Sequence, residues 1–204
     1  IALDLAASEF ESKGRYRLAL EDREFDTDGW LEVVYSWLQS YPILSIEDAV
    51  AENDEEGMRK LTAAVGGKVQ IVGDDFLVTN AQRIEQAAAM GACNAVLIKP
   101  NQTGTITDAH NALLKAQKAG WGTIVSARSG ESEDVTITHL DTGWNAGQLK
   151  VGSFARSERM AKWNEGLRIE RSQDVAAGFA GISKFPIKAP VLQKNGKLPA
   201  CADT

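Results

Sequence analysis

Six ionisable residues stand where short apolar runs of the sequence end. They are Asp4, Glu47, Asp74, Lys99, Arg128 and Lys150. From Glu47 onward, successive members lie 22 to 29 residues apart, which is about the length of one strand followed by one helix. A single charge at a strand end is ordinarily just solvated. Six charges in the same phase of a repeat instead predict side chains that meet at one edge of a sheet.

The types of these residues indicate a metal site beside a basic group. Three of them are carboxylates, and no histidine or cysteine stands among them. An oxygen-only set of ligands suits Mg²⁺ better than zinc. A lysine, with an ordinary pKa of about 10.4, becomes an effective base only when burial or neighbouring positive charge lowers that pKa. Together, these groups favour removal of a proton next to a carboxylate, with the metal stabilising the resulting enolate.

Apolar runs and amphipathic stretches alternate along residues 1–173. The runs predict strands at 1–6, 43–48, 69–74, 95–99, 123–126 and 148–151. The amphipathic stretches predict helices at about 29–41, 53–66, 80–91, 107–120, 133–143 and 157–169, and a polar, hairpin-like region precedes the first of them. Such alternation indicates a parallel sheet covered by helices. In a (β/α) barrel the carboxyl ends of the strands surround one mouth, which is where the six charges would converge.

Polar residues mark the expected helix starts. Asp28, Asn53 and Asn80 are candidate N-caps, because their side chains can accept hydrogen bonds from the free N–H groups of a first turn. Glu56 follows Asn53 by three residues, which is the spacing of a capping box. Glycines and prolines interrupt any period near the end of the chain, so residues 174–204 are predicted to be an irregular tail without helix or strand.

The composition is that of a globular protein. The chain has 204 residues, of which 44% are hydrophobic and 25% charged, and its formal net charge is −6. Acidic and basic residues are interspersed, which gives no reason to expect nucleic acid or an anionic membrane as partner. No apolar run approaches the ~20 residues that span a bilayer. Two cysteines, Cys93 and Cys201, are too few for a disulfide framework and favour a reducing cytoplasm.

Longer motifs surround the charged strand ends. They include Leu3-Asp4-Leu5-Ala6-Ala7-Ser8-Glu9-Phe10, Ser45-Ile46-Glu47-Asp48, Val72-Gly73-Asp74-Asp75, Leu97-Ile98-Lys99-Pro100-Asn101-Gln102, Arg128-Ser129-Gly130-Glu131-Ser132 and Gly147-Gln148-Leu149-Lys150. In this order they resemble the enolase family, the phosphopyruvate hydratases of glycolysis. The resemblance runs from residue 1 to about residue 170. It implies an α/β fold, a TIM-type (β/α) barrel, of which this chain holds about six βα units.

The resemblance implies a metal site and a base. Asp4, Glu47 and Asp74 match the three carboxylates that bind Mg²⁺ in the family. Lys99 matches the base that removes the α-proton of 2-phosphoglycerate. Lys150 matches the lysine that holds the substrate carboxylate and shares in catalysis.

The resemblance also implies a site for a small phosphorylated carboxylic acid. Arg128 and Ser129 match residues that hold the substrate phosphate, and Ser126 in the same motif is a further substrate-binding residue. The resemblance further implies a cytoplasmic lyase whose full-length form is a homo-oligomer.

The sequence departs from the family pattern at two places. Ala127 stands where the family has an active-site histidine. The chain also lacks counterparts of the family's amino-terminal domain and first barrel strands, which carry further catalytic and metal-binding groups. Because six strands cannot close an eight-stranded barrel, both edges of the sheet are expected to be open. We therefore expect a fragment of a longer enzyme that is inactive by itself.

Two other interpretations remain open at this stage. One keeps the fold and changes the reaction to another one on a phosphoenolpyruvate-like ligand, as in carboxyphosphonoenolpyruvate synthase. The other is a degenerate, non-catalytic relative that binds a partner. The presence of all three carboxylates and both lysines favours an enzyme over the last interpretation.

Overall fold

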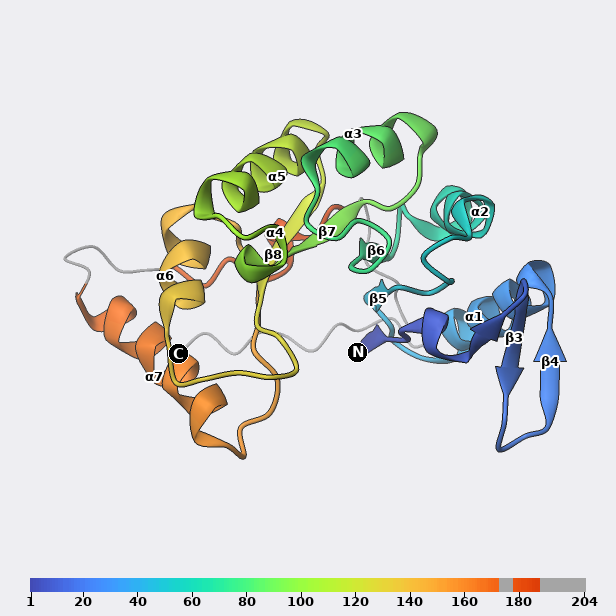
Figure 1. Ribbon diagram of the computed structural model, residues 1–204, viewed down its shortest axis with the longest axis horizontal. Coiled ribbons are helices and arrows are strands. Elements are labelled where there is room, and N and C mark those ends of the chain that lie inside the picture. Colours follow the sequence, from blue (N-terminus) through green and yellow to red (C-terminus); the bar gives the residue numbers. More distant parts are fainter. Residues whose placement is uncertain (173–177, 188–204) are drawn as a thin grey trace.

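Six short strands form one parallel sheet in the computed structural model, which describes residues 1–172 and 178–187 (Figure 1). The spatial order is β1-β5-β6-β7-β8-β9, so strands that follow one another in the sheet also follow one another along the chain. Their bounds are Ala2–Asp4, Ser45–Glu47, Gln70–Gly73, Ala95–Ile98, Gly122–Ser126 and Leu149–Lys150. The sheet curls into part of a barrel wall, which confirms the predicted incomplete TIM-type barrel.

Helices follow the strands and cover one side of the sheet, except that the last of them packs against the helix before it (Figure 1). They are α2 (Glu55–Val65), α3 (Ala81–Met90), α5 (Ile106–Lys118), α6 (Thr136–Gly143) and α7 (Ser157–Ser172). On β7, Val96 and Ile98 join the large core shared with the helices, whereas Ala95 and Leu97 belong to a second small cluster. This alternation follows from the two-residue period of a strand. The second cluster therefore marks the barrel interior, the face that also carries the strand-end charges.

A small antiparallel sheet confirms the hairpin-like region after β1. The 3₁₀ turn η1 (Ala7–Phe10) leads into β2 (Glu11–Ser12), β3 (Arg15–Leu18) and β4 (Arg23–Phe25), and α1 (Thr27–Ser40) follows. Trp30 of α1 is buried, stacks on Tyr16 of β3 with ring centroids 5.7 Å apart, and donates a hydrogen bond to the Ala49 carbonyl. These contacts tie the hairpin and α1 to the loop after β5.

The structure corrects two predicted helix caps. Asp26 rather than Asp28 caps α1, accepting a hydrogen bond from the Gly29 N–H, and Asp54 rather than Asn53 caps α2. The Asn80 cap of α3 is confirmed. The sequence analysis did not predict α4 (Pro100–Thr103), a single turn directly after Lys99.

Within the described residues, β1 and β9 each pair on one side only, as the strand count predicts. Of the predicted tail 174–204, residues 178–187 are described, and they include the 3₁₀ turn η2 (Gly181–Lys184) where no helix was expected. The remaining tail residues lie outside the described part, so the domain boundary at residue 173 stays a prediction. Among the described helices, none has the length and apolar character needed to cross a membrane.

Candidate active site

The register of the strands puts the predicted residues on one face at one end of the sheet. Asp4 pairs with Glu47 across β1 and β5, and Ser126 pairs with Lys150 across β8 and β9. A cavity of about 510 Å³ opens at these strand ends. The predicted residues that line it are Asp4, Asp74, Lys99, Ser126, Arg128, Ser129 and Lys150. Glu47 reaches the same group through a hydrogen bond from Lys150.

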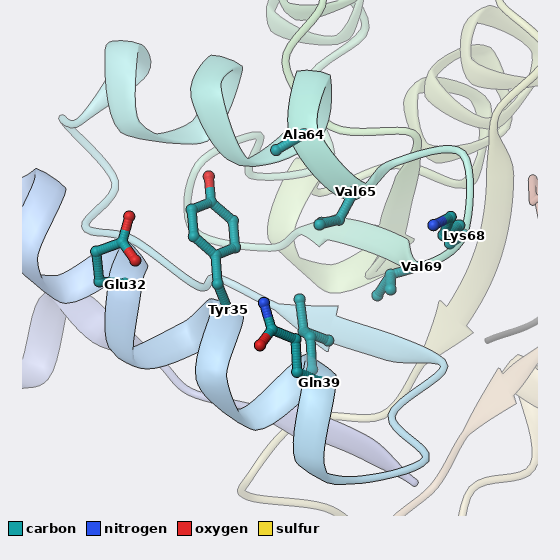
Figure 2. A pocket seen from close by; sticks show the side chains of 8 residues that line it. Glu32, Tyr35, Gln39, Ala64, Val65, Lys68 and Val69 are labelled. Atoms are coloured by element: carbon teal, nitrogen blue, oxygen red, sulfur yellow. The ribbon is translucent and has the colours of Figure 1, made fainter. Parts of the chain in front are cut away.

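Another hollow lies on the helical side of the molecule. It has a volume of about 540 Å³ and separates α1 from α2, with Tyr35 rising from α1 toward α2 (Figure 2). Its lining holds Glu32 and Lys68 as ionisable groups besides Tyr35, and otherwise consists of apolar residues and Gln39. Since it contains none of the strand-end carboxylates or lysines, the cavity at the strand ends is the candidate active site.

Lys150 joins the two edges of the sheet. Its Nζ lies 2.8 Å from Asp4 Oδ2 on β1 and 2.8 Å from both carboxylate oxygens of Glu47 on β5. Glu47 is only 6% exposed, and this burial raises the pKa of its carboxyl to about 7 in spite of the opposing effect of Lys150. Two of the three predicted metal ligands are therefore held together by a cation of the chain itself.

Lys99 and Asp74 form a second ion pair at the next strands. Lys99 Nζ donates to Asp74 Oδ2, and both side chains are largely buried. The other carboxylate oxygen, Oδ1 of Asp74, is buried and has no hydrogen-bond partner among the described residues. A buried carboxylate oxygen without a partner is costly unless a cation or donor completes it. This free oxygen fits a metal ion.

Two residues next to the predicted ligands, Asp48 and Asp75, have carboxylates close to that of Asp74. In the described part of the chain, the group of three possible metal ligands whose atoms all lie within 4.8 Å of one another consists of Asp48, Asp74 and Asp75, rather than the predicted three. The sequence motifs contained Asp48 and Asp75, but the strand-end pattern gave them no role. The adjacent carboxylates in Glu47-Asp48 and Asp74-Asp75 were the signal that could have found them.

Asp48 shapes the turn that carries Asp74. Its two carboxylate oxygens accept hydrogen bonds from the backbone N–H groups of Asp74 (2.9 Å) and Asp75 (2.8 Å). Burial is the main cause that raises the pKa of Asp48, to about 6, while these two hydrogen bonds lower it. The donor set is thus oxygen-only, crowded and partly unpaired, which suits a hard divalent cation such as Mg²⁺.

The opposite wall of the cavity is basic. Arg128 and Ser129 follow β8, and the Arg128 N–H donates to the Glu131 carboxylate at 2.7 Å. Ser126 is 2% exposed, and its hydroxyl donates to the Ala127 carbonyl, so that donor is already engaged. The methyl side chain of Ala127, at the position of the family histidine, provides no donor or charge.

Comparisons with known proteins show what the chain is similar to. A family model described as "Enolase, C-terminal TIM barrel domain" matches residues 1–187. The chain is 50% identical over 187 residues to "Enolase" of Acidothermus cellulolyticus and to "Enolase 1" of Desulfitobacterium hafniense. These matches cover 91% of this chain but 43% of each relative, so the chain spans less than half the length of the curated relatives it matches. The chain belongs to the enolase family and corresponds to its carboxy-terminal barrel domain.

Proposed function

We propose that this chain provides the catalytic face of an Mg²⁺-dependent lyase that interconverts 2-phosphoglycerate and phosphoenolpyruvate. The observation that carries the proposal is that one cavity, at the strand ends, contains these groups together. It gathers carboxylates, two lysines and an Arg-Ser pair from different strands. The curated relatives bear the name enolase, which supports the same reaction for the whole protein. We further propose a cytoplasmic protein that is a homo-oligomer in its full-length form.

Each side chain then has a chemical task. Lys99 can remove the α-proton only after its ammonium has released a proton to solvent, because a protonated amine cannot act as a base. Loss of the ion pair with Asp74 favours that release, since the carboxylate stabilises the ammonium form. Lys150 changes partners from Glu47 and Asp4 to the substrate carboxylate. Arg128 and Ser129, with Ser126 beside them, hold the phosphate.

Asp4, Glu47 and Asp74 are the residues that we propose to hold Mg²⁺. Bound there, the ion would stabilise the negative charge that develops on the substrate carboxylate. The free oxygen of Asp74 and the high pKa of Glu47 both fit a position that a cation completes. Asp48 and Asp75 are the neighbouring carboxylates through which the set could be extended.

Calorimetric titration with Mg²⁺ tests the metal assignment. We expect Asp74→Ala to weaken Mg²⁺ binding by roughly tenfold or more, since one ligand of a hard cation is lost. Asp22→Ala is the matched control, because the side chain of Asp22 is 92% exposed on the hairpin. Equal affinity in the Asp74 variant and the parent would refute the assignment, and loss only in Asp75→Ala would move the ion to the Asp48 side.

Formation of phosphoenolpyruvate, followed by its ultraviolet absorbance, tests the reaction itself. The assay is run on the 204-residue chain and on a protein that joins it to the part of a curated relative that lies outside the matched region. We expect the joined protein to turn over 2-phosphoglycerate, and the chain alone to bind phosphate without turnover. A joined protein that folds, binds Mg²⁺ and shows no turnover would contradict the proposed reaction.

Ala127 favours a second candidate function. A site without the histidine can bind a phosphoenolpyruvate-like ligand and carry out another reaction on it. The buried methyl group in the cavity wall is the observation that supports this alternative. An inert joined protein that still binds phosphoenolpyruvate would favour the changed reaction over the lyase.

A further inference from the structure

Two cations of α7 are buried behind the basic wall of the cavity. Arg159 is 6% exposed and Lys162 is 1% exposed, although both residues belong to types that are almost always solvated. They lie three residues apart on the helix, so they share one face. Both are directed at the loop after β8, which carries Arg128 and Ser129.

Arg159 binds three backbone carbonyls from two loops. Its Nη1 donates to the carbonyls of Arg128 at 2.9 Å and Val151 at 2.8 Å, and its Nη2 donates to that of Ser129 at 2.9 Å. All three of these residues line the cavity. Gly152 has a φ of +104°, and a Cβ built there would lie 3.6 Å from the Arg159 side chain. The guanidinium therefore fastens the ends of β8 and β9 to the first turn of α7.

Lys162 fastens the same loop further along. Its Nζ donates to the Ser132 carbonyl at 2.8 Å and lies 2.8 Å from Glu131 Oε2. The other oxygen of that carboxylate, Oε1, accepts the hydrogen bond from the Arg128 N–H. Residues 128–132 are thus held at one end by Arg159 and at the other by Lys162.

The bonds of Arg159 leave its charge uncancelled. All three go to carbonyl oxygens, and among the described residues it forms no ion pair with a carboxylate. Lys162, by contrast, is paired with Glu131. A buried guanidinium without a counter-ion is unfavourable by itself, and an anion in the adjacent cavity would relieve that cost. Arg128 lines the same cavity and adds positive charge there, whereas Arg156, also in the lining, is paired with Glu158.

We propose that Arg159 is a positioning residue for phosphate recognition. It holds the Arg128-Ser129 backbone in place through its three-carbonyl fork, and its charge attracts the phosphate. This inference rests on the proposed function, because it takes Arg128 and Ser129 as the phosphate-binding residues. A lysine cannot replace the fork, because its ammonium is a point charge without the planar geometry of a guanidinium.

Three variants distinguish the loss of the three guanidinium hydrogen bonds (the fork), the loss of the positive charge, and general damage to the helix. Arg159→Met removes both the fork and the charge, and Arg159→Lys keeps the charge alone. Arg171→Met is the matched control, because Arg171 is exposed in the last turn of the same helix. The probe is inorganic phosphate, titrated against the full chain, with Mg²⁺ titrated separately on the same samples.

We expect Arg159→Met to weaken phosphate binding about tenfold or more, Arg159→Lys to weaken it less, and both to leave Mg²⁺ affinity within about twofold of the parent. In the joined protein, KM for 2-phosphoglycerate rises and kcat is largely retained, since the phosphate is bound in ground and transition states alike. A general loss of structure would weaken both ligands together. Phosphate affinity in Arg159→Met equal to that of the parent and the control overturns the proposal.

Amide hydrogen exchange tests the positioning role without any ligand. We expect the amides of residues 128–132 to exchange faster in both Arg159 variants than in the control, because the fork is lost in each. Unchanged exchange there overturns the role, whatever the phosphate result. A parent chain that binds no phosphate overturns the proposed phosphate site and the recognition part of this inference, whereas faster exchange still supports the fork.

Discussion

Lys150 shows at the scale of single residues how the site balances its charge. Its ammonium lies between Asp4 and Glu47, which come from two other strands. Three carboxylates at one mouth repel one another, and a cation is needed to keep them ionised together. In the structure, lysines supply that cation, and a divalent ion would compete with them. Mg²⁺ binding and the availability of both lysines are therefore coupled.

Lys99 carries the proposed proton transfer. We expect Lys99→Ala in the joined protein to slow exchange of the substrate α-proton with solvent by about 10²- to 10⁴-fold, the usual contribution of a positioned base. Substrate affinity should change little, because the base acts chiefly in the transition state. Exchange is measured by mass spectrometry in heavy water, with Lys118→Ala on the exposed face of α5 as control. Exchange at the parent rate would exclude Lys99 as the base.

Ala127 tests whether the reaction has changed. A charge-assisted hydrogen bond to the phosphate contributes about 1.5–3 kcal/mol, so we expect Ala127→His to raise phosphoenolpyruvate formation by about 10- to 150-fold. Ala127→Leu controls for added volume without a donor, and it should not raise the rate. If neither variant gains activity and the parent is inert, the changed reaction becomes the better proposal.

At the scale of elements, Asp54 links three parts of the fold. Its carboxylate caps α2 at the Gly57 N–H and accepts hydrogen bonds from the hydroxyls of Tyr16 on β3 and Thr27 on α1. We expect Asp54→Ala to lower the free energy of unfolding by about 2–4 kcal/mol, the sum of a lost cap and a buried hydroxyl left unpaired. Urea denaturation measures the loss.

The neighbouring Asn53 provides the control for Asp54. Its side chain is exposed, and it was the cap that the sequence predicted. Asn53→Ala should change the free energy of unfolding by no more than about 0.5 kcal/mol. Equal losses in the two variants would show that Asp54 does not have the linking role described above.

The elements also show what sequence patterns can and cannot predict. Strand order and the Asn80 cap were predictable, because apolar runs alternate with amphipathic helices and one acceptor precedes α3. The predicted caps Asp28 and Asn53 lie two residues after Asp26 and one residue before Asp54, the observed caps, because several possible acceptors stand close together in the sequence. The contacts of Asp54 with Tyr16 and Thr27 could not be predicted from the sequence. The single turn α4 was too short to show a helical period.

The candidate site was also predictable only in part. Convergence of the strand-end charges followed from their phase along the chain. Which lysine meets which carboxylate did not follow, because a long side chain such as that of Lys150 can reach several strands. The buried Arg159 and Lys162 were missed as well, since polar residues on a helix ordinarily indicate its solvated face.

At the scale of the whole molecule, buried carboxyls make stability depend on pH. Burial raises the pKa of Glu47 to about 7 and those of Asp48 and Asp141 to about 6, all above their ordinary values. The folded state therefore binds these protons more tightly than the unfolded state does. The free energy of unfolding should then fall as pH rises from about 4 to about 7, in the absence of divalent cations.

Asp141 allows the pH dependence of stability to be tested away from the candidate site. Its Oδ1 is buried and lacks a hydrogen-bond partner among the described residues. We expect Asp141→Asn to stabilise the chain by about 1–2 kcal/mol near pH 7, a value reduced for partial solvent screening, and to add little below pH 4. Urea midpoints at about pH 4 and pH 7.5 with a chelator give the comparison. A gain from Asp141→Asn that is as large at the lower pH as at pH 7.5 would contradict the prediction.

The ion pair between Lys150 and Asp4 also has a consequence in time. The two residues are 146 positions apart in the chain, and Lys150 and Glu47 are 103 apart. During synthesis, Asp4 and Glu47 leave the ribosome long before Lys150 has been added to the chain. Until then, their carboxylates are solvated and lack this partner. Contacts between distant parts of a chain are also the slowest to form. We therefore expect the strand ends around the candidate site to assemble last. Ligand binding would then begin only when folding is complete.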